Sequence, residues 1–284
     1  MLRVRQRSES VRLLDDRDRD AALAVCDADP VANVFVASRI RALGLEPSRL
    51  GAQMWGFERN GQLTALCYAG ANLVPVQASS AAVLAFADRA LRQGRRCSSL
   101  VGSSAAVAEL WTQLRPHWGP PRDVRTSQPL MAIDGAPLVP PDPEVRRVRP
   151  GELDILMPAC VAMFTEEVGV SPTASDGGAA YRARVTELIR SGRAFARIED
   201  GRVIFKAEVG AATPQVCQVQ GVWVRPEFRG RGLAAPGMAA VVTQARRTIS
   251  PVVSLYVNDF NAPARATYHR AGFTEVGEFM SVLF

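Results

Sequence analysis

The stretch that decides the fold reads Val222-Trp-Val-Arg-Pro-Glu-Phe-Arg-Gly-Arg-Gly-Leu-Ala234. It continues a run of β-branched and aromatic residues that begins at Val216, a composition that predicts a strand ending at Val224. Gly230 and Gly232 then lie in an Arg-rich turn, and small residues predict a helix directly after it. Amides at a helix start favour an anion, so this turn can hold a diphosphate.

Two familiar phosphate-binding motifs are excluded at this turn. A P-loop needs Gly-Lys-Ser/Thr, and no such triplet follows Gly232. A dinucleotide fingerprint needs a third glycine, and Ala235 stands in that place. The residues instead read Arg-x-x-Gly-x-Ala, from Arg229 to Ala234.

A second pattern lies beyond the expected helix. Residues Val252 to Val257 predict another apolar strand, which leads to Asn261 and to a short helix that contains Tyr268. Gly272-Phe273 follows that helix. The turn and this downstream pattern are specific only in combination.

In combination, residues 145–284 resemble the GCN5-related N-acetyltransferase (GNAT) family. That family places an Arg/Gln-x-x-Gly-x-Gly/Ala loop on the coenzyme A diphosphate and follows it with a strand, an Asn, a Tyr and Gly-Phe. The resemblance covers about half of the chain. It implies acyl transfer from acetyl-coenzyme A, or another acyl-coenzyme A, to an amine by direct attack in a ternary complex. The whole chain also resembles actinobacterial members with an extra N-terminal domain of unknown function.

The resemblance implies a set of cofactor contacts. Backbone groups of the strand end pair with the pantetheine arm, and the turn binds the diphosphate. Arg231 and Arg265 reach phosphates or face water, and Asn261 binds pantetheine or caps its helix. The implied residues are Val222, Trp223, Val224, Arg229, Gly230, Arg231, Gly232, Leu233, Ala234, Asn261 and Arg265.

Gly221 stands alone inside the expected strand. An isolated glycine there indicates a β-bulge, or alternatively a close packing contact. The family splays two strands at this position, which implies backbone N–H groups that face the thioester oxygen.

Tyr268 is the general acid that the resemblance implies for the leaving thiolate, because the family's tyrosine between the Asn and Gly-Phe points at the sulfur. The alternative is a half-buried aromatic residue at helical spacing.

The general base is less well defined. Family members often carry a Glu on the strand before the turn, where this chain has Cys217, Gln218 and Gln220. Glu208 on the preceding strand is one candidate, acting through a water, or else it faces solvent and pairs with Lys206. Glu166 and Glu167, between the first two helices of this half, either bind the acceptor amine or form a solvated helix end.

The distribution of charged and apolar residues bears on whether the chain binds nucleic acid or a membrane. The net charge of +6 is spread over the chain, because residues 1–140 hold 17 basic and 13 acidic residues and residues 141–284 hold 17 and 15. Nucleic-acid binders usually cluster their bases, so no nucleic-acid partner is expected. Neither a signal-peptide run at the sequence start nor an 18-residue apolar span is evident, so we expect a cytoplasmic protein without a membrane partner.

The five cysteines are widely spaced and contain no Cys-x-x-Cys. They indicate neither a zinc site nor a disulfide framework, and we expect no metal. Cys217 lacks an activating partner for a nucleophilic role.

The proline-rich stretch from Gly135 to Pro150 predicts a linker, so we place an N-terminal domain at 1–140 and an acetyltransferase domain at 141–284. Both halves predict two helices, a hairpin, a third strand, helix, strand, helix and strand. In the first half the first helix is expected over Val11 to Ala28, and Val76 to Ser80 replaces the Arg-x-x-Gly turn. The predicted class is α/β, in the α+β sense of a mixed sheet: a GNAT fold preceded by a degenerate GNAT-like half.

Two functions remain open from the sequence. The first is an N-acetyltransferase whose acceptor amine is undetermined. The second is a non-catalytic acyl-coenzyme A sensor or interaction module, which the missing strand Glu favours. The protein is expected to be a monomer or a homodimer.

Overall fold

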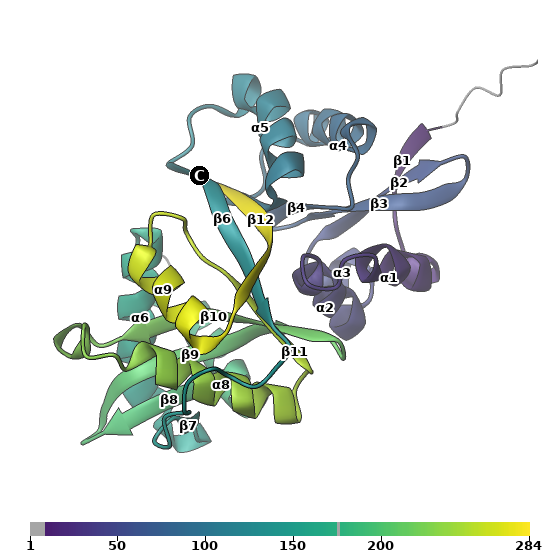
Figure 1. Cartoon of the computed structure of the whole chain (residues 1–284). Coiled ribbons are helices and arrows are strands. Elements are labelled where there is room, and N and C mark those ends of the chain that lie inside the picture. The colour runs from purple at the N-terminus through teal and green to yellow at the C-terminus, as the bar shows by residue number, and fades with distance from the viewer. Residues whose placement is uncertain (1–8, 175–176) are drawn as a thin grey trace, which may run out of the picture. The chain divides into compact units, whose positions relative to one another are not determined.

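The computed structural model describes residues 9–174 and 177–284 and has a mixed α/β fold (Figure 1). Two compact units interleave along the chain. Residues up to Leu130, together with Tyr256–Asp259 and Glu275–Phe284, form the first unit. Met131–Leu255 and Phe260–Thr274 form the second unit. Strands β6 (Asp123–Ile133), β11 (Val252–Tyr256) and β12 (Thr274–Leu283) contribute residues to both units.

The first unit is a sheet with helices on both faces. Its strands have the order β1-β2-β3-β4-β5-β12-β6. One hydrophobic cluster packs α4 and α5 on the sheet, and another packs α1, α2 and α3 (Figure 1). The elements are β1 (Glu9–Leu13), α1 (Arg19–Asp27), α2 (Val34–Leu43), α3 (Pro47–Leu50), β2 (Gln53–Arg59), β3 (Gln62–Ala69), β4 (Asn72–Val76), α4 (Ser80–Gln93), β5 (Ser99–Ser103) and α5 (Ser104–Trp118).

The expected helix over residues 11–28 is wrong in its first part. Residues Glu9–Leu13 form β1, which pairs antiparallel with β2 from Glu9↔Arg59 to Leu13↔Trp55. A capping box at Asp15 then starts a short 3-10 turn, and α1 begins only at Arg19. Leu13 is therefore the last residue of β1, and Leu14 follows it directly. Pairing with the sheet overrides the near-helical spacing of these leucines.

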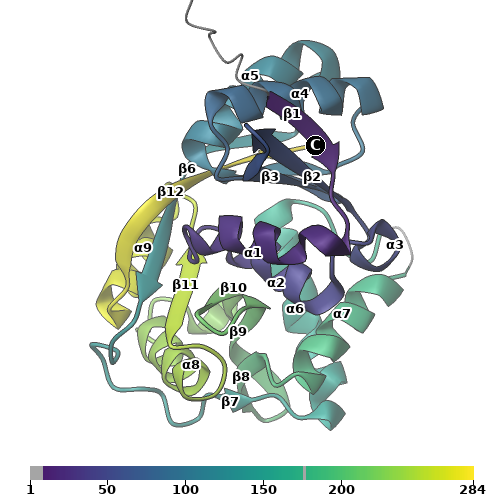
Figure 2. The same ribbon diagram turned by 90° about the vertical axis from the view of Figure 1, so that its right-hand side faces the viewer.

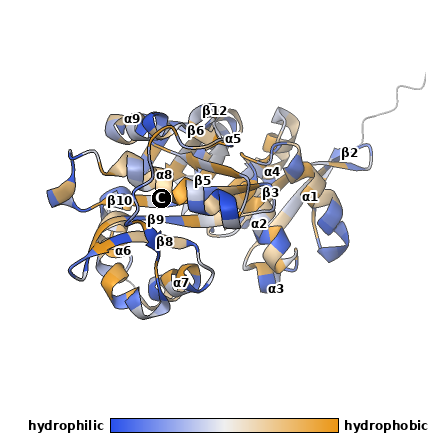
Figure 3. Ribbon diagram, turned by 60° about the horizontal axis from the view of Figure 1, so that its bottom comes forward, coloured by the Kyte–Doolittle hydropathy of each residue, from blue (hydrophilic) through white to orange (hydrophobic). Residues whose placement is uncertain are grey.

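The second unit has the strand order β6-β11-β10-β9-β8-β7. Helices α6 and α7 cover one face of β8, β9 and β10, and α8 covers the other (Figure 2). In Figure 3, α6 and α7 carry both hydrophobic and hydrophilic residues, as expected for helices with one buried side. The elements are β7 (Arg146–Arg147), α6 (Leu153–Val168), α7 (Ala179–Arg190), β8 (Ala194–Glu199), β9 (Arg202–Ala212), β10 (Val216–Val224), α8 (Ala234–Thr248) and α9 (Ala262–Ala271).

Strand β10 contains the predicted bulge. Gln220 pairs with Glu208 and Trp223 pairs with Lys206 on β9, so Gly221 and Val222 oppose the single residue Ala207. Gly221 has φ +59°, a conformation that glycine adopts without strain. The extra residue bends β10 where the strand approaches the turn.

Strands β10 and β11 separate along their length, as the resemblance implied. Their parallel pairing runs from Val216↔Val252 to Gln218↔Ser254, while β10 itself continues to Val224. The last part of β10 therefore has one edge paired with β9 and the other edge directed away from it.

Helix α8 lies close to the sheet because it has a glycine at the contact. A Cβ on Gly237 would lie 2.9 Å from three ring atoms of Phe205 on β9. This close approach fixes the N-terminus of α8 beside the end of β10.

The predicted fold class is confirmed, since each unit repeats a short strand, two main helices, a hairpin, a third strand, helix, strand and helix. The domain boundary between residues 140 and 141 stays a prediction. Within the described residues, the structure contains no helix with the length and apolar character needed to span a membrane.

Candidate functional site

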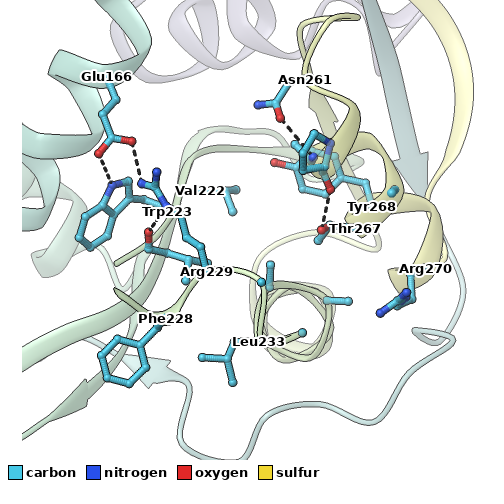
Figure 4. A pocket seen from close by; sticks show the side chains of 18 residues that line it. Glu166, Val222, Trp223, Phe228, Arg229, Leu233, Asn261, Thr267, Tyr268 and Arg270 are labelled. Carbon is cyan, nitrogen blue, oxygen red and sulfur yellow. Dashed lines mark hydrogen bonds and ion pairs between the residues drawn. The ribbon is translucent and has the colours of Figure 1, made fainter. Parts of the chain in front are cut away.

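A cavity of about 620 Å³ opens in the second unit, between the end of β10, the following turn, the start of α8 and one face of α9 (Figure 4). It is lined by Glu166, Val222, Trp223, Val224, Phe228, Arg229, Gly230, Gly232, Leu233, Ala234, Ala235, Asn261, Pro263, Ala264, Ala266, Thr267, Tyr268 and Arg270. The cavity thus brings together most of the residues that the sequence predicted for a cofactor.

The free edge of β10 presents peptide groups to this cavity. Arg225 N–H donates to the Ile204 carbonyl on β9 at 2.9 Å. Because peptide groups alternate along an antiparallel strand, those of Val224 and Val222 point away from β9. An extended arm that carries amides can therefore pair with this edge as an added strand would.

The turn and helix start provide amides for an anion. Gly230 and Gly232 have φ +74° and +76°, and a Cβ at either residue would meet no atom within 4 Å. The N-cap residue of α8, Leu233, has an apolar side chain, and Pro236 has no N–H. The amides of Ala234 and Ala235 therefore face outward at the positive end of the helix dipole.

Arg229 lies across the β10 edge in this structure. Its Nε donates to the Val224 carbonyl at 2.9 Å, and its Nη2 donates to Glu166 Oε2 at 2.7 Å. Glu166 Oε1 also accepts from Trp223 Nε1 at 3.2 Å (Figure 4). The Arg229 and Glu166 side chains are each 47% exposed, so their ion pair is worth at most about 1 kcal/mol. A ligand that pairs with Val224 can displace it.

Helix α9 places two predicted residues on the opposite wall. Asn261 Oδ1 accepts from Ala264 N–H at 3.2 Å, so Asn261 caps the helix while it also lines the cavity. Tyr268 is 7% exposed, and its ring packs edge-on against Phe273 with centroids 6.0 Å apart. Burial raises the pKa of Tyr268, and the charge of Glu167 raises it further. Tyr268 is therefore protonated at neutral pH, as an acid must be.

Four predicted residues lie outside the cavity lining within the described chain. The Arg231 guanidinium stacks 5.0 Å from the Phe228 ring centroid. Arg265 is half-buried on α9, Glu167 is exposed near the end of α6, and Glu208 is buried on β9. Sequence reasoning in turn missed several lining residues: Phe228, Ala235, Pro263, Ala264, Ala266, Thr267 and Arg270. The spacing of Pro263, Thr267 and Arg270 along one helix face was the available signal.

Glu208 is held in a buried hydrogen-bond network beside the bulge. Its Oε1 accepts from Gln220 Nε2 at 2.8 Å, and its Oε2 lies 3.4 Å from Lys206 Nζ. The sequence left open that Glu208 is a solvent-facing residue with no catalytic role. The solvent-facing part of that alternative is wrong, because Glu208 is 5% exposed. The ion pair with Lys206 that this alternative included is confirmed.

The five cysteines are free and buried. Burial raises the pKa of Cys217 to about 12, of Cys26 to about 12 and of Cys160 to about 11, and it raises the pKa of Cys67 and Cys97 as well. Because the thiolate is the nucleophile, none of these thiols is activated for attack at neutral pH.

A thiol titration checks that none of the five cysteines is reactive in the native protein. We expect an aromatic disulfide reagent at pH 8 to label none of the five cysteines rapidly in the native protein and all five in guanidinium chloride. Rapid labelling of one native thiol, located by peptide mapping, would contradict the assignment and return that cysteine to the list of candidate nucleophiles.

The first unit differs at the equivalent helix start. Ser79 caps α4 by accepting from Ala82 N–H at 3.4 Å, so a side chain occupies the place of an anion. A cavity of about 350 Å³ in this unit is lined instead by residues 51–55 and 69–73, by the end of α4 and the loop after it, and by Trp118 at the end of α5. The start of α4 is therefore capped by a side chain, whereas no side chain caps the start of α8.

Among residues 9–174 and 177–284, no group of three or more His, Cys, Asp or Glu side chains is placed to hold a metal ion.

Comparison with known proteins finds two family matches along the chain. Residues 168–273 match the acetyltransferase (GNAT) family, and residues 52–156 match a domain of unknown function (DUF4081). Among curated proteins, none matches the chain.

Solved structures match nearly the whole chain. A Drosophila protein has a TM-score of 0.67 at 16% identity, over 98% of this chain and 99% of that one. A GCN5-related N-acetyltransferase from Sphaerobacter thermophilus has a TM-score of 0.56 at 18% identity, over 96% and 94%. A tandem GNAT protein from the clavulanic acid biosynthesis pathway has a TM-score of 0.56 at 15% identity, over 96% and 98%. At these identities the likeness shows the fold, and it agrees with a tandem arrangement of two GNAT-like halves.

Proposed function

We propose that this chain, in which residues 168–273 match the GNAT acetyltransferase family, transfers an acetyl group from acetyl-coenzyme A to an amine. The observation that carries the proposal is that one wall of the cavity is formed by the free edge of β10 at Val222 and Val224, the turn glycines Gly230 and Gly232, and the start of α8. Such a wall suits a ligand with an amide-bearing arm and a diphosphate, which is the chemistry of coenzyme A.

Each part of the donor has a place in the proposed complex. The pantetheine amides pair with the Val222 carbonyl and with the peptide groups of Val224 along the free edge of β10, while the Val222 N–H faces the thioester. The diphosphate binds the amides of Gly230 to Ala235, and Arg229 leaves Val224 to approach it. The thioester then lies between the β10 bulge and Tyr268, which line opposite walls of the cavity.

The proposed reaction is a direct acyl transfer. The neutral amine attacks the thioester carbonyl, and negative charge develops on the carbonyl oxygen, where the Val222 N–H stabilises it. The carbon–sulfur bond breaks, and Tyr268 donates its proton to the leaving thiolate. The attacking nitrogen, which carries a positive charge once the carbon–nitrogen bond has formed, loses a proton to a base, for which Glu166, Glu167 and Glu208 stay candidates.

A second function follows from one observation. Both oxygens of Glu208 are paired, which disfavours it as a base. A protein that binds acyl-coenzyme A without turnover, as a sensor or interaction module, fits this arrangement as well.

Two measurements test the proposal. Native mass spectrometry of the purified protein is expected to show co-bound coenzyme A or its acetyl form, and calorimetry is expected to show one site per chain for acetyl-coenzyme A. Incubation with a panel of amines then identifies the acceptor by its mass gain of one acetyl group. Tight binding with no acetylated amine would favour the sensor, and no binding at all would refute both functions.

A further inference from the structure

The chain contains a single lysine, Lys206, among 34 basic residues, and it is buried. Lys206 is 1% exposed on β9, on the face covered by α6. An ammonium group loses its hydration when it is buried, so its position needs specific partners. Those partners lie at the bulge of β10.

Lys206 Nζ donates to the Gly221 carbonyl at 2.8 Å, and it lies 3.4 Å from Glu208 Oε2. Gly221 is the residue at which β10 bends away from the regular register with β9. A Cβ at Gly221 would come within 3.0 Å of both Lys206 Nζ and the Met163 methyl group. The lysine is therefore packed directly against the bulge and is not a distant ion-pair partner.

The peptide group that joins Gly221 to Val222 connects this lysine to the cavity. In a trans peptide the C=O and the following N–H point in opposite directions. When Lys206 holds the Gly221 carbonyl on the α6 side, the Val222 N–H is directed to the other side, and Val222 lines the cavity. The lysine thus fixes the direction of the N–H assigned above to the thioester oxygen.

The charge of Lys206 adds to this orientation. A cation on a peptide oxygen draws electron density from the amide nitrogen and makes its N–H a stronger donor, and the effect is larger where water is excluded. We infer that Lys206 is a positioning residue for acyl transfer, which orients and polarises the Val222 N–H through the Gly221 carbonyl. This inference rests on the proposed function.

The test is infrared spectroscopy of bound acetyl-coenzyme A labelled with ¹³C at the thioester carbonyl, a measurement that needs no acceptor amine. In the wild-type protein we expect the carbonyl stretch at lower frequency than in water, because a donated hydrogen bond weakens the C=O bond. In Lys206→Met we expect most of that shift to be lost while the affinity for unacylated coenzyme A changes less than threefold. Turnover with an identified amine is expected to fall by about 10-fold to 100-fold, less than the loss from deleting an entire oxyanion donor.

Two further variants separate positioning from stability. Lys206→Met leaves Glu208 buried without its cation, so the double variant Lys206→Met with Glu208→Gln removes both charges and is expected to fold. Its bound thioester is expected to lack the shift as well. Met163→Leu changes another side chain packed on the bulge at similar volume and is expected to keep the shift.

The outcomes are distinct. A full shift in both Lys206 variants, with only a lower melting temperature, would overturn the inference and leave Lys206 a structural residue. A wild-type carbonyl frequency no lower than in water would overturn it without any variant. Failure of the wild-type protein to bind acetyl-coenzyme A would overturn the proposed function and this inference together.

Discussion

Tyr268→Phe is expected to lower the turnover number by about 100-fold, the scale of a positioned general acid. The phenol lines the cavity opposite the β10 bulge. Burial raises its pKa, so Tyr268 is protonated and can donate a proton to the leaving thiolate. Phenylalanine keeps the ring contact with Phe273, so the dissociation constant of coenzyme A is expected to change less than twofold. Steady-state kinetics and calorimetry on the same preparations measure both quantities.

Tyr68→Phe is the matched control for this change. Tyr68 is 6% exposed in the first unit, close to the 7% of Tyr268, and lies outside the cavity. We expect wild-type turnover in this variant. Equal activity of Tyr268→Phe and Tyr68→Phe would remove Tyr268 from the mechanism.

The pH dependence of turnover provides a second readout of Tyr268. Its folded pKa is raised above the ordinary value of 10, so the protonated, active form persists through pH 10. Turnover limited by Tyr268 is therefore expected to decline only above that pH. A decline centred at or below pH 9 that is absent in Tyr268→Phe would contradict this assignment.

Gly232→Glu is expected to weaken acetyl-coenzyme A binding by about 100-fold or more. Gly232 has φ +76°, which strains any side chain, and it lines the cavity at the proposed diphosphate site. A carboxylate placed there would face the diphosphate, and like charges brought together cost several kcal/mol, where each 1.4 kcal/mol is tenfold in affinity. Calorimetry measures the change directly.

Gly201→Glu controls for the backbone strain. Gly201 has φ +70° in the β8–β9 hairpin, and a Cβ there, as at Gly232, would meet no atom within 4 Å. The two variants are expected to lose similar thermal stability, but only Gly232→Glu should lose affinity. Equal affinity in the two would refute the diphosphate site.

Much of this arrangement could be predicted from the sequence, because local signals and the fold agree. Strand β10 spans Val216–Val224 as expected, and α8 begins at Ala234, directly after the glycines. Turn residues at 60–61 and 200–201 mark both hairpins. Each of these features depends on residues close together in the chain.

The features that could not be predicted depend on partners distant in the sequence. Strand β1 is a strand because it pairs with β2, some 46 residues away, and its own residues carry a helical spacing. The ion pair between Arg229 and Glu166 joins residues that are 63 positions apart in the sequence. The role of Lys206 also depends on a distant partner. The sequence shows a single lysine, but only the structure shows that it donates to the Gly221 carbonyl.

The central claim is that the backbone from the β10 bulge to the start of α8 holds the acyl donor. Amide hydrogen exchange with and without acetyl-coenzyme A tests it most directly, because it reports on those N–H groups themselves. The account predicts slower exchange on binding in peptides that cover residues 222–235, and unchanged exchange at the β8–β9 hairpin around Gly201. Saturating acetyl-coenzyme A that leaves exchange across 222–235 unaltered would contradict it.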